Sequence, residues 1–412
     1  MKRFGTVLIT VVAAGLAWTA MAQVPIEPEK MMETVRFLSD QPLRGRGLGT
    51  PEVDQAAMFI ARRFEAVGLL PGGAPNGSWY QEWTDPETRV RMRNVVGILP
   101  GRSAEHTGQS VVIGAHYDHL GMGLSGALKE NQGKVHPGAD DNASGVAVLL
   151  ELVERLTLVA DMERTIVFVA FTGEEAGRKG SRYYVENEKR YPVTRTVGMI
   201  NLDTVGRLGK GKLIVLGSGS AKEWPAILRE AGKAAGVELA ESVQDLDASD
   251  QKSFLDAGVP AVQLFTGAHL DYHRPTDTAD KIDGKGLVKV ATVARAVAFA
   301  VANFPGPLTR TIAALPGTPS PARSDRKVTI GIIPDFTYNE KGVRLGGTQP
   351  GGPAEKAGMK EGDVILQAGN TPVVVLKDLS DALKTKQPGE KLPVRYLRGG
   401  KEMNAELDVK ER

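Results

Sequence analysis

Two adjacent carboxylates, Asp140 and Asp141, stand in the segment HPGADDNASG, immediately before the apolar run VAVLLELVERL. Capping of the following helix explains one acidic residue, because a side-chain oxygen there accepts hydrogen bonds from the free N–H groups of the first turn. Two consecutive carboxylates repel each other unless a cation lies beside them. The pair therefore indicates a metal site, with helix capping as the alternative.

Further residues that bind metals or transfer protons follow four apolar runs of the sequence. Alone, each group has a simpler explanation, such as a solvated turn for Glu174-Glu175 or a strand-end turn for Asp203. Their joint occurrence favours one site, to which most of the six histidines would contribute. The groups are His116 and Asp118 after SVVIGA, Glu174 and Glu175 after TIVFVAFTG, Asp203 after GMINL, and His269, Asp271, Tyr272 and His273 after AVQLFTGA.

The chain contains no cysteine, so thiolate metal sites and disulfides are excluded. Histidine, aspartate and glutamate suit zinc, although cobalt or manganese can fill such a shell. Two zinc ions ~3.5–4 Å apart need a carboxylate that bridges them. We expect Asp140 to be this bridge.

Strand and helix patterns alternate through the first three quarters of the chain, which predicts an α/β domain with an open, mostly parallel or mixed sheet and helices on both faces. Ligands of such sheets bind beyond the carboxyl ends of the strands, so the loops above should converge there. Expected strands are 94–99, 110–116, 165–171, 198–203, 212–217 and 261–265; expected helices lie within 29–69, interrupted by a loop at 38–50, and at 146–156, 223–236 and 286–304.

Composition and termini limit the classes of partner. The formal net charge of +2, from 51 basic and 49 acidic residues, gives no strong field for nucleic acid or membrane. The opening MKRFGTVLITVVAAGLAWTAMAQ reads as a signal peptide over residues 1–22, so we expect a secreted or periplasmic protein that starts near Gln23. A retained anchor is disfavoured, because the apolar stretch is shorter than the ~20 residues of a membrane span.

The sequence changes character near its end. Residues 23–308 form the predicted catalytic domain, and residues 309–327 form a Pro-, Ser- and Thr-rich linker without periodicity. Residues 328–412 carry strand patterns such as VTIGII, VRLGG, DVILQAG and LPVRYL around two short helices. A separate, small β-rich module is expected there.

The motif series GAHYDHLG, HPGADDNASG, FTGEEAG, INLDTVG and DYHRPTDT resembles the di-zinc aminopeptidase family that also contains glutamate carboxypeptidase and glutaminyl cyclase. The resemblance covers nearly all of residues 30–305. It implies the zinc aminopeptidase fold and two Zn²⁺ ions. By this resemblance His116 and Asp203 hold one ion, Glu175 and His273 hold the other, and Asp140 bridges them.

The same resemblance implies the catalytic roles. Glu174 matches the general base that takes a proton from the attacking water and passes it to the leaving amine. Asp118 matches the partner that orients the His116 imidazole, and Tyr272 matches the residue that stabilises the tetrahedral oxyanion. A cis peptide is expected between Asp140 and Asp141. Gln251 departs from the family, which often has histidine there, and we expect this to alter the pocket rather than catalysis.

The C-terminal module resembles a PDZ domain of the rearranged bacterial type, from about Val328 to the end. The resemblance implies that the backbone of Ile330, Gly331, Ile332 and Ile333 receives an added peptide strand and its terminal carboxylate. The alternative is a module that packs on the catalytic domain without binding peptide.

The sequence as a whole favours a secreted or periplasmic zinc aminopeptidase that acts on peptides. A zinc carboxypeptidase or dipeptidase on the same core is the first alternative, because an arginine such as Arg178 or Arg274 could recognise a carboxylate. A PDZ peptide-binding scaffold with a vestigial metal site is a second alternative, and glutaminyl cyclisation is a third. Neither a phosphate-binding loop at LGSGSAKEW nor a calcium site at Asp245, Asp247 and Asp250 is favoured; these acids are expected in a solvated or substrate-facing loop.

Overall fold

The computed structural model describes residues 25–73, 77–123, 127–159, 162–243, 246–311 and 327–411. The predicted signal peptide and most of the predicted linker lie outside these residues. Within the described ranges, none of the helices combines the length and the apolar character that crossing a bilayer requires.

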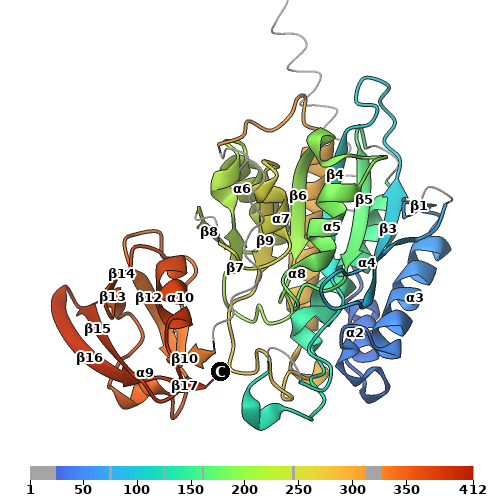
Figure 1. The fold of residues 1–412 in the computed structure, drawn as a ribbon. Coiled ribbons are helices and arrows are strands. Elements are labelled where there is room, and N and C mark those ends of the chain that lie inside the picture. Colours follow the sequence, from blue (N-terminus) through green and yellow to red (C-terminus); the bar gives the residue numbers. More distant parts are fainter. Residues whose placement is uncertain are drawn as a thin grey trace, which may run out of the picture.

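A nine-stranded sheet forms the centre of the larger domain (Figure 1). The strand order is β1-β3-β5-β4-β6-β9-β7-β8, with β2 paired to β3. The four central strands β5, β4, β6 and β9 run parallel, whereas β3 and β7 join them antiparallel. The bounds are β1 Leu70–Pro71, β2 Tyr80–Thr84, β3 Arg91–Leu99, β4 Ser110–His116, β5 Thr165–Phe171, β6 Thr196–Leu202, β7 Leu213–Leu216, β8 Leu239–Ser242 and β9 Ala261–Phe265.

Helices cover both faces of this sheet, because alternate strand residues face opposite cores. Along β4, Val111, Ile113 and Ala115 pack with α2, α3, α4, α6 and α8, while Val112 faces the core that contains α5 and α7. Both faces of the central strands are thereby buried, so the strand ends remain as the place for polar chemistry. The helices are α2 Pro28–Leu38, α3 Pro51–Ala66, α4 Gly145–Thr157, α5 Lys179–Asn187, α6 Trp224–Ala235, α7 Gln251–Asp256 and α8 Gly284–Ala302.

The C-terminal residues form a second body with its own hydrophobic core (Figure 1, orange to red). Its main sheet has the order β11-β12-β13-β15-β16, which leaves β11 at an edge. Its elements are β10 Val328–Thr329, β11 Ile332–Pro334, β12 Val343–Thr348, α9 Pro353–Lys356, β13 Val364–Ala368, β14 Thr371–Pro372, α10 Leu376–Lys384, β15 Lys391–Arg398, β16 Lys401–Asp408 and β17 Lys410–Glu411.

The predicted fold class is confirmed. The expected strands 110–116, 165–171 and 261–265 coincide with β4, β5 and β9. Two predictions were too coarse: the short helices α5 and α7 were missed, and VTIGII was expected as one strand. The chain divides that segment into β10 and β11 at Gly331, whose φ of +67° lies in the left-handed region that glycine tolerates.

Candidate metal centre

The polar loops converge at one edge of the sheet, as the strand pattern predicted. His116 ends β4, Asp203 follows β6, and Glu174 and Glu175 follow β5. The segment that contains Asp141 leads into α4. Because β4, β5 and β6 are parallel neighbours, their carboxyl ends deliver these side chains to the same place.

The first group of possible metal ligands consists of His116, Asp141 and Asp203, which we call the His116 cluster. His116 Nε2 lies 3.2 Å from Asp141 Oδ1 and 3.4 Å from Asp203 Oδ1. All three residues are buried. His116 Nε2 has no hydrogen-bond partner among the described residues although two carboxylate oxygens face it, which is the arrangement expected of ligands that point at a common cation.

The second group uses the other oxygen of the same carboxylate. Asp141 Oδ2 lies 3.2 Å from His273 Nε2, which is also 3.2 Å from Glu175 Oε2. His119 Nδ1 lies 2.9 Å from Glu175 Oε1 and 3.9 Å from Asp141 Oδ2. These four residues are called the His273 cluster. Asp141 therefore stands between two sets of ligands, with one oxygen turned to each.

The prediction that Asp140 bridges the metals was wrong, and Asp141 occupies that position. Asp140 turns away from the His116 and His273 clusters: its Oδ1 accepts the Gly206 N–H at 2.6 Å, and its Oδ2 lies 3.1 Å from His269 Nε2. The cis peptide is likewise one residue later than expected, between Asp141 and Asn142. The two adjacent carboxylates avoid each other by facing opposite sides of the loop.

Backbone contacts of the Asp140–Asn142 segment explain which carboxylate reaches the centre. Asp277 Oδ2 accepts the main-chain N–H groups of Asp140 and Asp141, at 2.9 and 3.1 Å. Asn142 donates its side-chain amide to Leu202 O at the end of β6 and accepts the N–H of Gly145, the first residue of α4. The loop is thus tied to β6, to α4 and to the segment after His273.

The hydrogen bonds at the start of α4 test the alternative that the two carboxylates cap this helix. The residue before α4, Ser144, makes no side-chain cap hydrogen bond, and Asn142 supplies the acceptor for Gly145 instead. Among the described contacts, the Gly145 N–H at the start of α4 is accepted by Asn142 and not by Asp140 or Asp141. The paired carboxylates are therefore not explained by helix capping.

Glu174 and Asp118, predicted as catalytic residues, are joined through the main chain. Asp118 Oδ1 accepts the N–H of Glu174 at 3.2 Å, and Asp118 Oδ2 accepts the N–H of Glu175 at 3.4 Å. The carboxylate is 3.7 Å from His116 Nδ1, while the Asp118 carbonyl oxygen is 3.1 Å from the same nitrogen. Asp118 therefore orients His116 mainly through its backbone, and its side chain fixes the turn that carries Glu174.

Tyr272 packs beside the His273 cluster. Its ring stacks on the His273 ring with centroids 3.9 Å apart and planes 20° apart. His273 itself has a positive φ of 57°, an uncommon conformation for a residue with a Cβ and one that occurs at functional sites. The backbone therefore holds His273 in a turn that the surrounding contacts must stabilise.

Charge in the centre is dominated by carboxylates. Burial lowers the pKa of His273, but Glu175 and Asp141 raise it to about 9 overall. Burial likewise lowers the pKa of His116, and Asp203, Asp118 and Asp141 raise it well above its ordinary value. A set of imidazoles among surplus negative charge is the electrostatic setting of a cation site.

The pKa values of the adjacent carboxyl groups support the reassignment. Burial and Glu175 raise the pKa of Asp141, but His119, His116 and His273 hold it far below its usual range. Burial raises the pKa of Asp140 despite the hydrogen bond with His269. The surroundings of Asp141 therefore favour its ionised form, which is the form that binds metal.

The donor set fits zinc. The His116 and His273 clusters supply only imidazole nitrogens and carboxylate oxygens, the ligands that zinc takes in the absence of cysteine. The His116 cluster offers three donor residues and the His273 cluster offers four, and Asp141 is counted in both because it turns one oxygen to each. The residues present can therefore hold two ions that share Asp141.

Several contributors to the centre were missed at the sequence level. His119 was not named as a ligand, although most of the six histidines were expected at the site, and Asp277 was read as part of DYHRPTDT without a role. Arg46 was not singled out, yet its buried guanidinium donates to the carbonyls of Tyr117, Pro137 and Gly138. A signal for His119 existed in the HYDH pattern, which places a histidine three residues after the first ligand.

The acidic segment 245–250 also differs from expectation. Asp250 is fully buried rather than solvated, and Asp247 pairs with Arg178 at 2.9 Å; Asp245 lies outside the described residues. Gln251 is buried as well, and its Oε1 accepts from Asn201 at 3.2 Å. The segment leads into α7, which contacts β6 and β9.

Comparison with known proteins gives the family. Residues 94–298 match peptidase family M28, and residues 329–409 match the PDZ domain. The chain is an M28 peptidase with a C-terminal PDZ domain. The M28 domain contains every ligand of the His116 and His273 clusters.

Curated relatives of the M28 domain include two aminopeptidases. Aminopeptidase YwaD of Bacillus subtilis is 27% identical over 222 residues, which cover 52% of this chain and 45% of YwaD. A probable leucine aminopeptidase of Arthroderma otae is 26% identical over 288 residues, which cover 67% of this chain and 74% of the relative. The chain therefore spans less than half of YwaD and about three quarters of the fungal protein.

Solved structures confirm the fold. BSAP, a zinc aminopeptidase from Bacillus subtilis, superposes with a TM-score of 0.56 at 18% identity, covering 71% of this chain and all of BSAP. Porphyromonas gingivalis glutaminyl cyclase gives a TM-score of 0.55 at 19% identity, covering 66% of this chain and 97% of the cyclase. At 18–19% sequence identity, both comparisons show the fold and do not show the reaction.

In the expected peptide-binding segment of the PDZ domain, Ile330 and Gly331 are buried, and Ile332 and Ile333 are half-buried. Ile330 is buried in the PDZ core, and the Gly331 N–H is already taken by Thr329 Oγ1. Ile332 and Ile333 pair with β12 on one side only, since β11 is the edge strand. The open edge of β11, rather than all of residues 330–333, is the surface that could accept a further strand.

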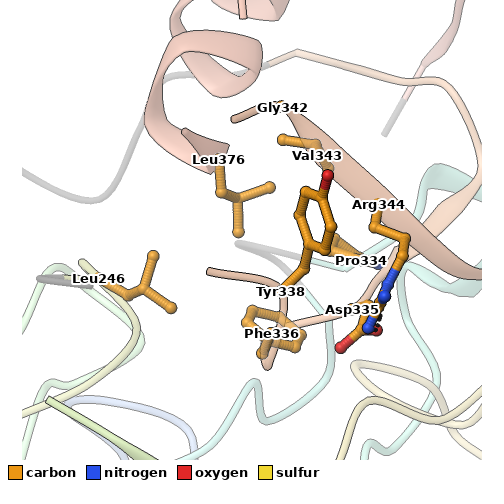
Figure 2. A pocket seen from close by; sticks show the side chains of 9 residues that line it. All are labelled: Leu246, Pro334, Asp335, Phe336, Tyr338, Gly342, Val343, Arg344 and Leu376. Atoms are coloured by element: carbon orange, nitrogen blue, oxygen red, sulfur yellow. Dashed lines mark hydrogen bonds and ion pairs between the residues drawn. The ribbon is translucent and has the colours of Figure 1, made fainter. Parts of the chain in front are cut away.

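A pocket lies where this edge strand meets the M28 domain (Figure 2). Pro334 ends β11 and Phe336 follows it, Leu376 begins α10, and Leu246 belongs to the M28 domain. Phe336 also packs edge-on against Phe265 at the end of β9, with ring centroids 5.4 Å apart. One end of the PDZ surface is therefore in contact with the M28 domain.

Proposed function

We propose that this chain is a zinc-dependent aminopeptidase that removes N-terminal residues from peptides. The observation that carries the proposal is the placement of Asp141, whose two oxygens face separate clusters of metal ligands 3.2 Å away on each side. The aminopeptidase names of YwaD and the Arthroderma protein support the choice among M28 reactions.

Two zinc ions, held by His116, Asp203, Glu175, His273 and the bridging Asp141, would supply Lewis-acid activation of a water molecule and of the scissile carbonyl. Glu174 is buried beside Glu175 and acts as the general base, taking a proton from the attacking water and delivering it to the leaving amine. Asp118 holds the Glu174 turn through the N–H groups of Glu174 and Glu175. Tyr272 is assigned to the oxyanion, with its ring oriented by stacking on His273.

The preference for a free amine over a carboxylate follows from the fixed charges. Arg178 is engaged by Asp247 and Ser253. Arg207, whose Nε lies 3.8 Å from Asp140 Oδ2, is paired with Asp271 and Asp277 at 2.8 Å each. Because both guanidinium groups are already paired with carboxylates, neither is placed to bind the carboxylate of a substrate.

The decisive experiment uses one peptide in three forms: unblocked, N-acetylated and C-amidated. The zinc-loaded chain is incubated with each, and the released residues are identified by mass. Stepwise loss from the amino end, abolished by acetylation and indifferent to amidation, is expected. Release from the carboxyl end would favour a carboxypeptidase, cyclisation of an N-terminal glutamine would favour a cyclase, and no reaction would favour a peptide-binding scaffold.

We further propose that the protein is exported and that its PDZ domain binds peptide. Export is supported by the signal-peptide pattern of residues 1–22. It is tested by fractionating expressing cells and determining the N-terminus, expected at Gln23. Peptide binding is supported by the unpaired edge of β11. It is tested by titrating the full chain with C-terminal peptides and their amidated forms, which should bind more weakly.

A further inference from the structure

His119 is the third histidine of the two clusters, beside His116 and His273, and has no role in the proposed reaction. It is buried, and its main chain is fixed because its N–H donates to Arg46 O and it forms a bridge with Gly47. The neighbouring Gly138 leaves room for its ring: a Cβ on Gly138 would stand 2.5 Å from His119 Cδ2. The ring therefore has a defined place beside the loop that carries Asp141.

The distances around His119 Nδ1 are those of a shared coordination shell. The nitrogen is 2.9 Å from Glu175 Oε1 and 3.9 Å from Asp141 Oδ2. Zinc–ligand bonds of ~2.1 Å in a tetrahedron place neighbouring ligand atoms about 3.4 Å apart. The contacts of His273 Nε2 with Asp141 and Glu175, both 3.2 Å, belong to the same range.

The two imidazoles approach the carboxylates from different directions. The His119 and His273 ring centroids are 5.8 Å apart and their planes meet at 77°. Each ring directs a nitrogen at both Glu175 and Asp141 rather than at the other ring. The donor atoms of His119, Asp141 and Glu175 all lie within 4.8 Å of one another, and His273 Nε2 contacts the same two carboxylates.

We propose that His119 is a zinc ligand, so that the His273 cluster binds its ion with four protein residues while the His116 cluster binds with three. This inference rests on the proposed di-zinc function. Closed, four-ligand zinc sites are typical of firmly held metal, whereas sites with three protein ligands keep a position open. The ion of the His273 cluster is therefore the tightly retained one, and the ion of the His116 cluster is the exchangeable one.

The competing role of His119 is to donate a hydrogen bond from Nδ1 to Glu175 and so to orient a ligand. Loss of such an orienting partner also weakens metal binding, by ~10–100-fold. Zinc affinity alone therefore does not distinguish a ligand from an orienting partner. The number of imidazoles bound to the ion distinguishes them.

The test uses His116→Gln as the background, because this variant weakens the His116 cluster and leaves one firmly held zinc. Zinc K-edge absorption of this chain should show two imidazoles on the ion, and His116→Gln/His119→Gln should show one. In the otherwise wild-type chain, a chelator titration should show that His119→Gln weakens the tighter of the two zinc sites at least ~10-fold. His136→Gln is the matched control, since His136 is a buried loop histidine that contacts Lys134 O and belongs to neither cluster.

One imidazole in the His116→Gln chain, unchanged by the second substitution, would overturn the assignment and leave His119 as a positioning residue. Unaltered zinc affinity in His119→Gln would also overturn it. A wild-type chain that binds fewer than two zinc ions would contradict the di-zinc proposal itself. Correct folding of each variant is checked by its circular dichroism in the presence of zinc.

Discussion

Asp277 holds Asp141 in place from outside the metal centre: its Oδ2 accepts the Asp141 N–H at 3.1 Å, although 136 residues separate the two. The same oxygen accepts the N–H of Asp140, and Oδ1 accepts from Arg207 at 2.8 Å. This buried carboxylate is thus saturated with donors. The position of the metal bridge depends on a residue that touches no metal ligand side chain.

Asp277→Asn should weaken zinc binding by about 10–100-fold, the usual effect of losing an orienting partner. An asparagine must turn its NH₂ group either toward Arg207 or toward the two N–H groups, and either arrangement sets donor against donor. Zinc content after dialysis against graded chelator measures the effect. Asp271→Asn is the control, because Asp271 pairs with Arg207 and Lys281 but does not contact the Asp140–Asp141 backbone. Equal losses in both variants would attribute the effect to Arg207 instead.

The types of ligand and their location at the carboxyl ends of β4, β5 and β6 could be predicted from the sequence. These features are local, because a strand end fixes where the next side chain goes. The choice between Asp140 and Asp141 could not be predicted, since it depends on Asp277 and Gly206, which are remote in sequence. The burial of Asp250 was missed for a related reason: no helix was predicted at residues 251–256, and the packing of α7 against β6 and β9 is a tertiary effect.

Asp141→Asn and Asp140→Asn form an isosteric pair that tests the reassigned bridge. Asp141→Asn should lose both zinc ions, because a neutral amide cannot bridge two cations. Asp140→Asn should retain both ions, since Asp140 faces Gly206 and His269 instead. Zinc per chain and thermal stability of the two variants are compared. Loss of zinc in Asp140→Asn with retention in Asp141→Asn would restore the sequence-based assignment.

Glu174→Gln should keep zinc and lose ~10²–10⁴-fold in turnover, the contribution expected of a general base. The amide preserves the shape of the side chain and the N–H contact with Asp118 but cannot accept the proton. Glu175→Gln, one residue away, should lose zinc instead, because Glu175 belongs to the His273 cluster. Turnover and zinc content are measured on the same preparations. Near-wild-type turnover of Glu174→Gln would remove Glu174 from the base role.

Arg46→Met should destabilise the domain by roughly 3–5 kcal/mol, because several buried carbonyl groups lose their donor at once. The Arg46 guanidinium donates to the carbonyls of Leu38, Tyr117, Pro137 and Gly138, and burial lowers its pKa to about 10. Arg44→Met, a nearby exposed arginine, is the control and should change stability little. Urea unfolding of the zinc-loaded chains gives the difference, and similar midpoints for the two variants would show that water replaces the guanidinium.

Asp250 makes the stability of the zinc-free chain depend on pH. The side chain is fully buried, and burial raises its pKa to about 7 although His116 and Ser181 act to lower it. The unfolded chain ionises this group near its ordinary pKa of ~3.9, so the folded state binds the proton more tightly. The resulting stability is present below that value and is lost as the pH rises toward 7.

Asp250→Asn removes this loss, because the amide stays neutral at every pH. The free energy of unfolding of the variant should therefore rise relative to wild type by roughly 2–3 kcal/mol between pH 5 and pH 8. Denaturant unfolding of chelator-treated chains measures it, since bound cations near His116 and Asp203 would favour the ionised form. Asp247→Asn removes an exposed charge from the same segment and serves as the control. Parallel pH profiles of wild type and Asp250→Asn would show that Asp250 is already ionised in the folded chain, with water reaching it below the sheet edge.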